Sequence, residues 1–248
     1  MAKIFRTPTG YVVEDTGTYR VLEGELFGEW RAGAEVAAPS TVLAPVVPSK
    51  IVCIGLNYKD HAAEQGKPLP AEPLIFLKPS SAIVHPGEAI EIPPGVGRVD
   101  YESEVAVVIG RRATRVSEAE AMSHVLGLTC MNDVTARDLQ KKDGRYTRAK
   151  GFDTFAPLGP CIATGLSADD LAVSGVLNGE IRQQSSTREL IFPVATLIAY
   201  ISRIMTLLPG DVVSTGTPAG IGPLQPGDEI VVRVQGIGEL RNPVIAAG

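Results

Sequence analysis

The chain has 248 residues, of which 44% are apolar, so it can bury a full core as one large domain or as a large and a small one. Its 23 Lys and Arg are outnumbered by 28 Asp and Glu, and the basic residues form no run that could follow a phosphate backbone. This composition excludes a disordered or fibrous protein and argues against nucleic acid as a partner.

Nothing in the sequence predicts export or membrane insertion. Residues 1–10 contain two basic side chains without an apolar segment behind them, which is unlike a secretory signal. The longest apolar stretch, residues 194–208, includes Thr, Ser and Arg and is too polar to span a bilayer. We therefore expect a cytoplasmic protein without a membrane partner. The cysteines lie far apart in apolar segments, which favours buried, inert thiols: Cys53, Cys130 and Cys161.

The chain changes character after its first fifth. Residues 1–38 alternate short apolar and polar stretches around turn signals, which predicts a small meander of strands. Residues 37–48 are rich in Pro and Ala and are typical of a linker. Buried strands punctuated by Gly and Pro follow. We therefore expect a small amino-terminal domain over 1–48 and a larger domain over 49–248.

The larger part is predicted to begin with a buried strand at 51–55. A short helix over 58–65 should follow, capped by Asn57 and ended by Gly66. Further strands are expected at 74–77, 102–109, 126–131, 212–213 and 229–234. The Asn178-Gly179 dipeptide predicts a hairpin between its flanking stretches.

A second, longer helix is predicted between Pro193 and Pro209. Its apolar face should consist of Val194, Leu197, Ile198, Ile201, Ile204, Met205 and Leu208. Many non-adjacent strands with few helices argue for an α+β fold whose core is a mixed sheet or a partly open barrel.

Acidic side chains gather where one of these strands begins. Glu102 and Glu104 are two residues apart, so on a strand they project from the same face. Burial of two like charges requires a raised pKa or a cation, and Asp133, after the next strand, could add a third carboxylate. Such oxygens suit Mg²⁺, Mn²⁺ or Ca²⁺. The spacing alone is most often that of an exposed strand face paired with Lys or Arg.

A titratable pair lies on the short helix. His61 and Glu64 are three residues apart, so they share a face and can act together as a base. A solvated helix face is the alternative. His85 and His124 are expected to be structural.

Further polar residues could bind an anionic substrate. Arg137 and Gln140 share one face of a predicted helix start, and Lys150 is a cation flanked by small residues. Residues 215–222 form a Gly-rich turn whose amides could cradle an anionic oxygen, with the Thr217 hydroxyl as a further donor. Taken singly, Arg137 and Lys150 are each more typical of a solvated surface charge.

Several motifs are absent from the sequence. No Gly-rich phosphate loop or dinucleotide fingerprint occurs, so a nucleotide cofactor is not expected. No nucleophile elbow of the α/β-hydrolase type occurs either.

Taken together, the motifs resemble the fumarylacetoacetate hydrolase family, in its branch of short bacterial acylpyruvate hydrolases, oxaloacetate decarboxylases and 2-hydroxyhepta-2,4-diene-1,7-dioate isomerases. The resemblance covers residues 50–245. The segments that carry it are, in chain order, 55–64 (GLNYKDHAAE), 76–79 (FLKP), 100–105 (DYESEV), 132–138 (NDVTARD), 150–153 (KGFD), 178–180 (NGE), 210–211 (GD) and 215–218 (TGTP).

The resemblance implies a fold and a set of site residues. The fold is an α+β mixed β-sandwich roll, like the fumarylacetoacetase carboxy-terminal domain, with a small amino-terminal β domain and a homodimeric assembly. The implied metal ligands, for Mg²⁺ or Mn²⁺ with Ca²⁺ as a substitute in crystals, are Glu102, Glu104 and Asp133. The implied catalytic residues are His61, Glu64 and Lys150, with the dyad on a lid helix. The implied substrate-binding residues are Arg137, Gln140, Lys150 and Thr217.

The expected function is divalent-metal-dependent hydrolysis of a C–C bond in an acylpyruvate or related dioxo acid, through a metal-stabilised enolate. The His61–Glu64 dyad favours this outcome because hydrolysis needs an activated water. Oxaloacetate decarboxylation and isomerisation or tautomerisation of a dienedioate remain open at the same site. The resemblance also implies a place in aromatic catabolism. A non-catalytic metal-binding β-protein is the alternative from another class.

Overall fold

The amino-terminal residues form the predicted meander of antiparallel strands. The structure is a computed structural model that describes residues 1–248. The meander consists of β1 (Lys3–Thr7), β2 (Gly10–Asp15), β3 (Thr18–Gly24) and β4 (Trp30–Val36). Its first strand pairs with β13 (Ala156–Ala163), so the meander continues a sheet of the larger part. The division at residues 48 and 49 stays a prediction.

The rest of the chain alternates strands with short helices. The other strands are β5 (Ile51–Gly55), β6 (Leu74–Lys78), β7 (Ile83–Val84), β8 (Ile90–Ile92), β9 (Val99–Tyr101), β10 (Ser103–Ile109), β11 (Val125–Asn132), β12 (Thr135–Ala136), β14 (Ala172–Leu177), β15 (Glu180–Ser186), β16 (Val212–Ser214), β17 (Gly222–Pro223), β18 (Glu229–Val234) and β19 (Gly238–Ala246). The α-helices are α1 (Lys59–Glu64), α2 (Glu118–Ala121), α3 (Arg137–Asp143), α4 (Thr147–Lys150) and α5 (Val194–Ile204). Single 3-10 turns lie at Ser80–Ala82, Met122–His124 and Thr187–Glu189.

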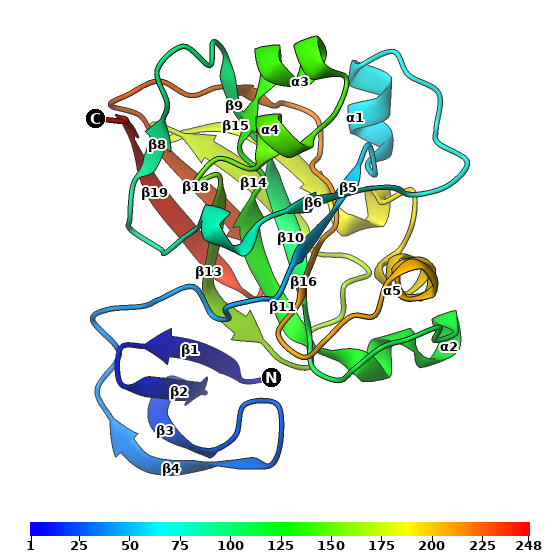
Figure 1. Cartoon of the computed structure of the whole chain (residues 1–248). Helices are drawn as coiled ribbons and strands as arrows, with labels where there is room; N and C mark the ends of the chain where they lie inside the picture. The colour runs from blue at the N-terminus through cyan, green and yellow to red at the C-terminus, as the bar shows by residue number, and fades with distance from the viewer.

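The strands form two packed sheets and a small third one. The large sheet has eleven strands in the order β4-β3-β2-β1-β13-β11-β10-β16-β5-β6, with β7 beside β13. A five-stranded sheet, β15-β14-β18-β19-β8, packs against its central strands, and β12-β9-β17 form the third. Both parallel and antiparallel pairs occur, and helices are few (Figure 1). The predicted α+β fold with a mixed-sheet core is confirmed.

The central strand β10 is buried on both faces, which explains its unbroken apolar run. Val105 and Val107 point into the layer shared with the five-stranded sheet and α5. Ala106 and Val108 point to the other face, where the amino-terminal meander contributes Ile4 to the same cluster. A strand covered on both sides cannot alternate apolar with polar residues.

Two local predictions need correction. Asn57 does not cap the short helix: Tyr58 occupies the cap position, and the Asn57 side chain instead donates to the carbonyl oxygens of Thr215 and Phe192 and accepts from Phe192 N–H. The amide therefore fastens two loops together. A sequence signal for a cap cannot distinguish this use, because the same Asn oxygen serves either partner.

The longer helix ends earlier than predicted. α5 stops at Ile204, where the backbone of Met205 turns extended, and Leu207 leaves the helix to pair with Ala113. Ile204 and Leu208 are consequently exposed and not part of the buried face. Tertiary pairing with the segment after β10 therefore overrides the helical periodicity of the sequence.

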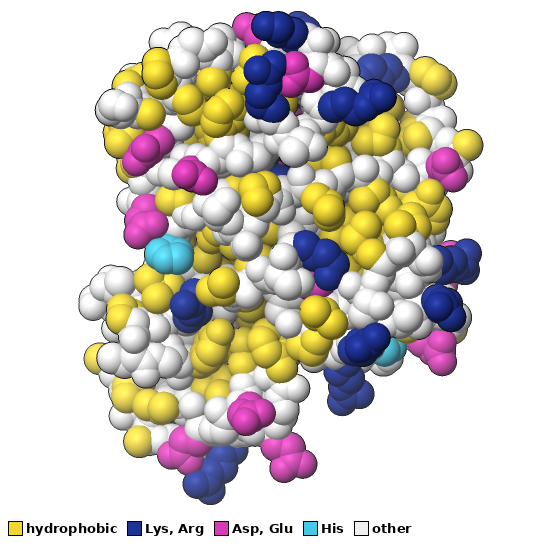
Figure 2. Space-filling view, viewed as in Figure 1, with side chains coloured by type: hydrophobic (Ala, Val, Ile, Leu, Met, Phe, Trp, Pro, Cys, Tyr) yellow, Lys and Arg dark blue, Asp and Glu magenta, His cyan; other side chains and the backbone are white.

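The face of the molecule in Figure 2 carries its charges singly or in small groups, with apolar side chains between them. Lys and Arg side chains on this face form no continuous band. No helix is long and apolar enough to cross a bilayer.

Candidate active site

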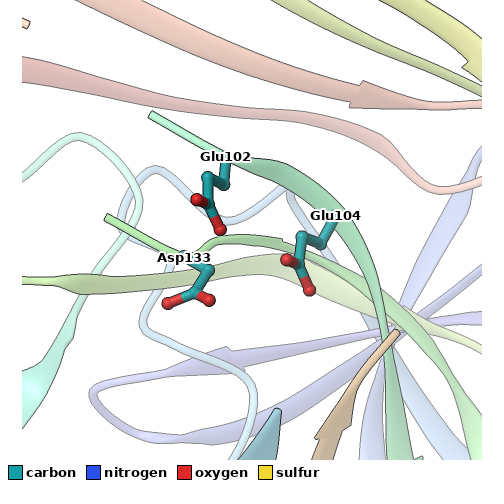
Figure 3. A group of neighbouring side chains, drawn as sticks. All are labelled: Glu102, Glu104 and Asp133. Carbon is teal, nitrogen blue, oxygen red and sulfur yellow. The ribbon is translucent and has the colours of Figure 1, made fainter. Parts of the chain in front are cut away.

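Three carboxylates converge at the end of the two central strands (Figure 3). Glu104 lies on β10, Glu102 lies at the break between β9 and β10, and Asp133 directly follows β11. Antiparallel pairing of β10 with β11 sets Glu104 opposite Met131, and Asp133 N–H donates to the Glu102 carbonyl at 2.9 Å. The register of two neighbouring strands therefore brings the acids together.

The three acids fit a divalent cation. Each offers a carboxylate oxygen, and these oxygens lie within 4.8 Å of one another. Glu102 is 6% exposed and the other two are 1% exposed, which excludes the alternative of a solvated strand face. An oxygen-only donor set without Cys or His suits a hard cation such as Mg²⁺, Mn²⁺ or Ca²⁺.

Buried cations balance part of this charge. The Lys150 ammonium donates to Glu102 Oε2 at 2.8 Å and to Asp133 Oδ2 at 2.6 Å. Lys78, which is fully buried, donates to the other Asp133 oxygen at 2.6 Å and to the Val134 carbonyl at 3.0 Å. Asp133 is thus held by a lysine on each side.

Arg137, at the start of α3, joins two acidic residues. Its guanidinium donates to Glu102 Oε1 at 2.5 Å and to Asp100 Oδ2 at 2.9 Å. It also donates to Gln140 Oε1 at 2.6 Å, as their spacing on one helix face predicts. Arg98 pairs with the remaining oxygen of Asp100.

The two glutamates have opposite electrostatic surroundings. Burial disfavours the charged form of Glu102, but Lys150 and Arg137 outweigh it and lower its pKa to about 2. Burial raises the pKa of Glu104 well above its usual value, and the nearby charges of Asp133 and Glu102 raise it further. The negative charge of Glu104 is therefore only partly compensated by the protein. A cation bound beside it would compensate the rest.

The histidine of the short helix is buried and contacts two residues of its own chain segment, Glu64 and Gln65. His61 is 5% exposed, and its Nδ1 lies 3.0 Å from Glu64 Oε2. The Gln65 amide nitrogen lies 2.7 Å from His61 Nε2. Because an amide nitrogen only donates, Nε2 is the acceptor and Nδ1 carries the proton that Glu64 accepts. The solvated helix face is therefore excluded for His61.

The Gly-rich turn holds the protein's own carboxylates. Gly216 N–H donates to Glu104 Oε2 at 2.9 Å, and Gly220 N–H donates to Glu64 Oε1 at 3.0 Å. The anionic oxygens that these two amides bind belong to the protein itself. Binding of a substrate oxygen by the turn stays a prediction. Thr217 is also engaged, since its hydroxyl donates its one hydrogen to the Ser103 carbonyl at 3.1 Å and accepts from the Gln183 amide at 2.8 Å.

One small cavity joins most of the predicted residues. It is lined by Ile54, Gly55, Leu56, His61, Gln65, Lys67, Phe76, Glu102, Glu104, Arg137, Gln140, Tyr146, Lys150 and Thr217. Glu64 and Asp133 stand behind this lining, in contact with His61 and Lys150. The helices α1, α3 and α4, which supply much of the lining, lie at the end of the molecule opposite the meander (Figure 1).

Sequence reasoning missed several residues of the site. Lys78 received no role, although a single lysine at the end of an apolar strand and before a proline was a usable signal. Gln65, Lys67 and Tyr146 line the cavity from segments without a distinctive pattern. Their positions depend on how the chain turns after α1 and before α4.

Known proteins are similar to this chain in sequence and in architecture. Residues 50–245 match the family model for the fumarylacetoacetate (FAA) hydrolase C-terminal region. The bovine mitochondrial oxaloacetate tautomerase FAHD2A is 43% identical over 218 residues, which cover 83% of this chain and 69% of that protein.

Solved structures agree over the whole chain. The structure of 2-hydroxyhepta-2,4-diene-1,7-dioate isomerase from Mycobacterium marinum is 40% identical, with a TM-score of 0.89 over 100% of this chain and 98% of the other. The fumarylacetoacetate hydrolase from Exiguobacterium antarcticum is 34% identical, with a TM-score of 0.89 over 100% of both chains. The chain therefore belongs to the fumarylacetoacetate hydrolase family.

Proposed function

We propose that this chain is an enzyme that interconverts the keto and enol forms of a small 2-oxo acid. One observation carries the proposal: a buried histidine, oriented by Glu64, lines the same small cavity as Glu102 and Glu104. The histidine base and the acidic cluster thus border the same position for a substrate. A solvent-exposed or purely structural metal site would not need a histidine held in this way.

In this proposal Glu102, Glu104 and Asp133 hold Mg²⁺ or Mn²⁺. A cation held by these residues would polarise the 2-oxo group as a Lewis acid. Lys150 places a positive charge beside the same position, in contact with Glu102 and 5.0 Å above the Phe76 ring. This charge stabilises the negative charge that develops on the substrate oxygen. Arg137, Gln140 and Thr217 line the cavity and position the substrate.

His61 moves the proton. Glu64 keeps the Nδ1–H of His61 occupied, so the lone pair of Nε2 is the base. Gln65 covers that lone pair and is exposed, so an entering substrate can displace its amide. His61 then takes a proton from the carbon beside the oxo group and returns one to the oxygen, which converts ketone to enol without change of charge or composition.

The names of two relatives favour proton transfer over hydrolysis as the reaction of this enzyme. The bovine relative is named a tautomerase and the Mycobacterium marinum structure an isomerase, and both reactions move protons only. The hydrolysis that the sequence favours remains the second candidate, supported by the hydrolase from Exiguobacterium antarcticum. It requires the same His61–Glu64 pair to hold a water. Decarboxylation of oxaloacetate is a third outcome at the same site.

The cellular setting belongs to the proposal as well. We propose a cytoplasmic homodimer acting on small 2-oxo acids, with the aromatic catabolism suggested by the resemblance as its context. A non-catalytic metal-binding role is less well supported, because it leaves the burial of His61 and its contacts with Glu64 and Gln65 without a purpose.

The test is an assay of Mg²⁺- or Mn²⁺-loaded protein with oxaloacetate, acetylpyruvate, fumarylpyruvate and hydroxyheptadienedioate. We expect faster keto–enol exchange of oxaloacetate, abolished by EDTA and reduced 10²- to 10⁴-fold in His61→Asn, the range for losing an acid–base group. His124→Asn, which lies outside the cavity, is the matched control. Activity that ignores chelator and His61→Asn alike would refute the proposal. Cleavage of acetylpyruvate without exchange of oxaloacetate would favour hydrolysis.

A further inference from the structure

The peptide between the two glutamates lacks a strand partner on one side. β10 pairs with β16 only from Ala106 to Val108, so this ladder ends before Ser103, the residue between Glu102 and Glu104. Ser103 is fully buried. Buried backbone groups need hydrogen-bond partners, so those of Ser103 must be met from outside this ladder.

A closed ring of hydrogen bonds from Gln183 and Thr217 supplies these partners. Gln183 Oε1 accepts the Ser103 N–H at 2.9 Å, and the Thr217 hydroxyl donates to the Ser103 carbonyl at 3.1 Å. Gln183 Nε2 donates to the Thr217 hydroxyl at 2.8 Å and to the Pro218 carbonyl at 2.9 Å. Because a backbone N–H only donates and a carbonyl only accepts, the orientation of the Gln183 amide is fixed and both of its N–H groups are used.

Gln183 reaches this place from the other sheet. It lies on β15 and is the one buried residue of that strand. An amide side chain is buried at a cost unless its hydrogen bonds are made. Its pairing partner on β14 is Gly175, where a Cβ would lie 2.8 Å from Gln183 Oε1 and 2.5 Å from Ser103 Oγ. The glycine therefore leaves the room that the amide needs to reach Ser103.

The turn of residues 215–222 also contacts Glu104. Its Gly216 N–H donates to Glu104 Oε2 at 2.9 Å, and Gln183 holds the same turn from the other sheet. Gln183 therefore reaches Glu104 by two routes, through the Ser103 peptide and through the turn. Gln183 itself is not part of the cavity lining.

We propose that Gln183 is a positioning residue of the candidate site. It fixes the peptide between Glu102 and Glu104, and so the spacing of the two carboxylates, without touching substrate or cation. A residue behind the ligands contributes by holding them in the geometry that a cation needs. The inference rests on the proposed function for the cation and for the reaction.

Two measurements on the full-length protein separate positioning from a purely structural role. The first is the affinity for Mn²⁺, titrated into cation-free protein and followed by electron paramagnetic resonance. The second is the free energy of unfolding of the same proteins in urea. The variants are Gln183→Met, which removes the polar groups at similar size, and Gly175→Ala, which keeps the amide but pushes it aside. The matched control is Gln184→Met, at the exposed glutamine next along the strand.

We expect Gln183→Met to bind Mn²⁺ about tenfold more weakly, the size of effect found when a contact behind a metal ligand is lost. Gly175→Ala should weaken binding in the same direction, and Gln184→Met should bind like the wild type. At saturating Mn²⁺ the kcat of Gln183→Met for keto–enol exchange should stay about tenfold below that of the wild type, because misplaced carboxylates misplace the cation.

Wild-type Mn²⁺ affinity in folded Gln183→Met would overturn the inference, whether or not stability is lost, and so would equal weakening in Gln184→Met. If Gln183→Met does not fold, unchanged affinity in Gly175→Ala overturns it instead. Weaker Mn²⁺ binding in both variants of a protein whose wild type shows no keto–enol exchange would refute the proposed function alone.

Discussion

Asp133 illustrates how a buried acid is held ready by its neighbours. One of its oxygens faces Lys78 and the other faces Lys150, and all three side chains are buried. Burial lowers the pKa of Lys78, and the charge of Asp133 offsets this effect only in part. A buried pair of this kind contributes little net stability while intact but is costly to break from one side.

Replacing Lys78 by Met should therefore destabilise the protein by about 3 kcal/mol, because Asp133 loses a buried partner. The free energy of unfolding, measured by urea denaturation of cation-free protein, checks this. The double variant Lys78→Met with Asp133→Asn should recover part of the loss. A loss below about 1 kcal/mol in the single variant, the size of a solvated pair, would contradict the buried ion pair.

Among the elements, the sequence predicted the strands that have a local apolar or turn signal better than the strands that are fixed by pairing with their neighbours. β5, β10, β11 and the hairpin β14–β15 follow directly from apolar runs and from the Asn178-Gly179 turn. The strands β13 and β19 were not expected, because each carries proline inside and draws its order from neighbouring strands. Pairing across the sheet, which no local pattern encodes, decides such segments.

The loop tie at Asn57 gives a test that separates it from a helix cap. If Asn57 were a cap, Asn57→Ser or Asn57→Asp would be nearly neutral. Because its amide donates to the buried Thr215 carbonyl and the half-buried Phe192 carbonyl, both variants should lose about 2 kcal/mol of stability. Thermal or urea unfolding measures the difference, and Lys59→Met on the adjacent helix serves as the unaffected control. Neutral behaviour of both variants would restore the cap interpretation.

For the whole molecule, the large sheet lies between two apolar layers, one on each of its faces. Cys53 lies in the layer shared with the meander, while Cys130 and Cys161 lie in the layer between the two sheets. Burial raises the pKa of all three thiols, that of Cys161 to about 12. The sequence predicted correctly that all three are buried and free, because apolar segments surround them. Their inertness stays a prediction.

These thiols report on the cooperativity of the core. Thiolate is the reactive form, so the raised pKa of each buried thiol disfavours its reaction in the native protein. At about pH 8 we expect no reaction with a thiol reagent in the native protein, and simultaneous exposure of all three in one denaturant transition. Mass spectrometry after pulse labelling assigns each site. Labelling of Cys53 well before the other two would contradict a single cooperative core.

The sequence predicted the candidate site only in part, because the tertiary fold brings residues from distant segments into it. Glu102 and Glu104 could be paired from a two-residue spacing, His61 and Glu64 from a three-residue spacing, and Asp133 from its place after the next strand. The ordered motifs then implied a role for each. Lys67 and Lys78 enter through chain reversals and strand order, which become visible only in the folded molecule. Motifs thus identify the residues that carry the chemistry. The tertiary fold determines which neighbouring side chains neutralise their charge and line the cavity beside them.

The central claim, that Glu102, Glu104 and Asp133 hold one divalent cation, is tested by titrating cation-free protein with Mn²⁺ and counting bound ions by electron paramagnetic resonance. We expect one site per chain, weakened at least about tenfold in Glu104→Gln and in Asp133→Asn, because loss of a ligand costs no less than loss of a supporting contact. Glu120→Gln, an exposed acid far from the cavity, should bind like the wild type. Equal Mn²⁺ affinity in all these proteins would contradict the account.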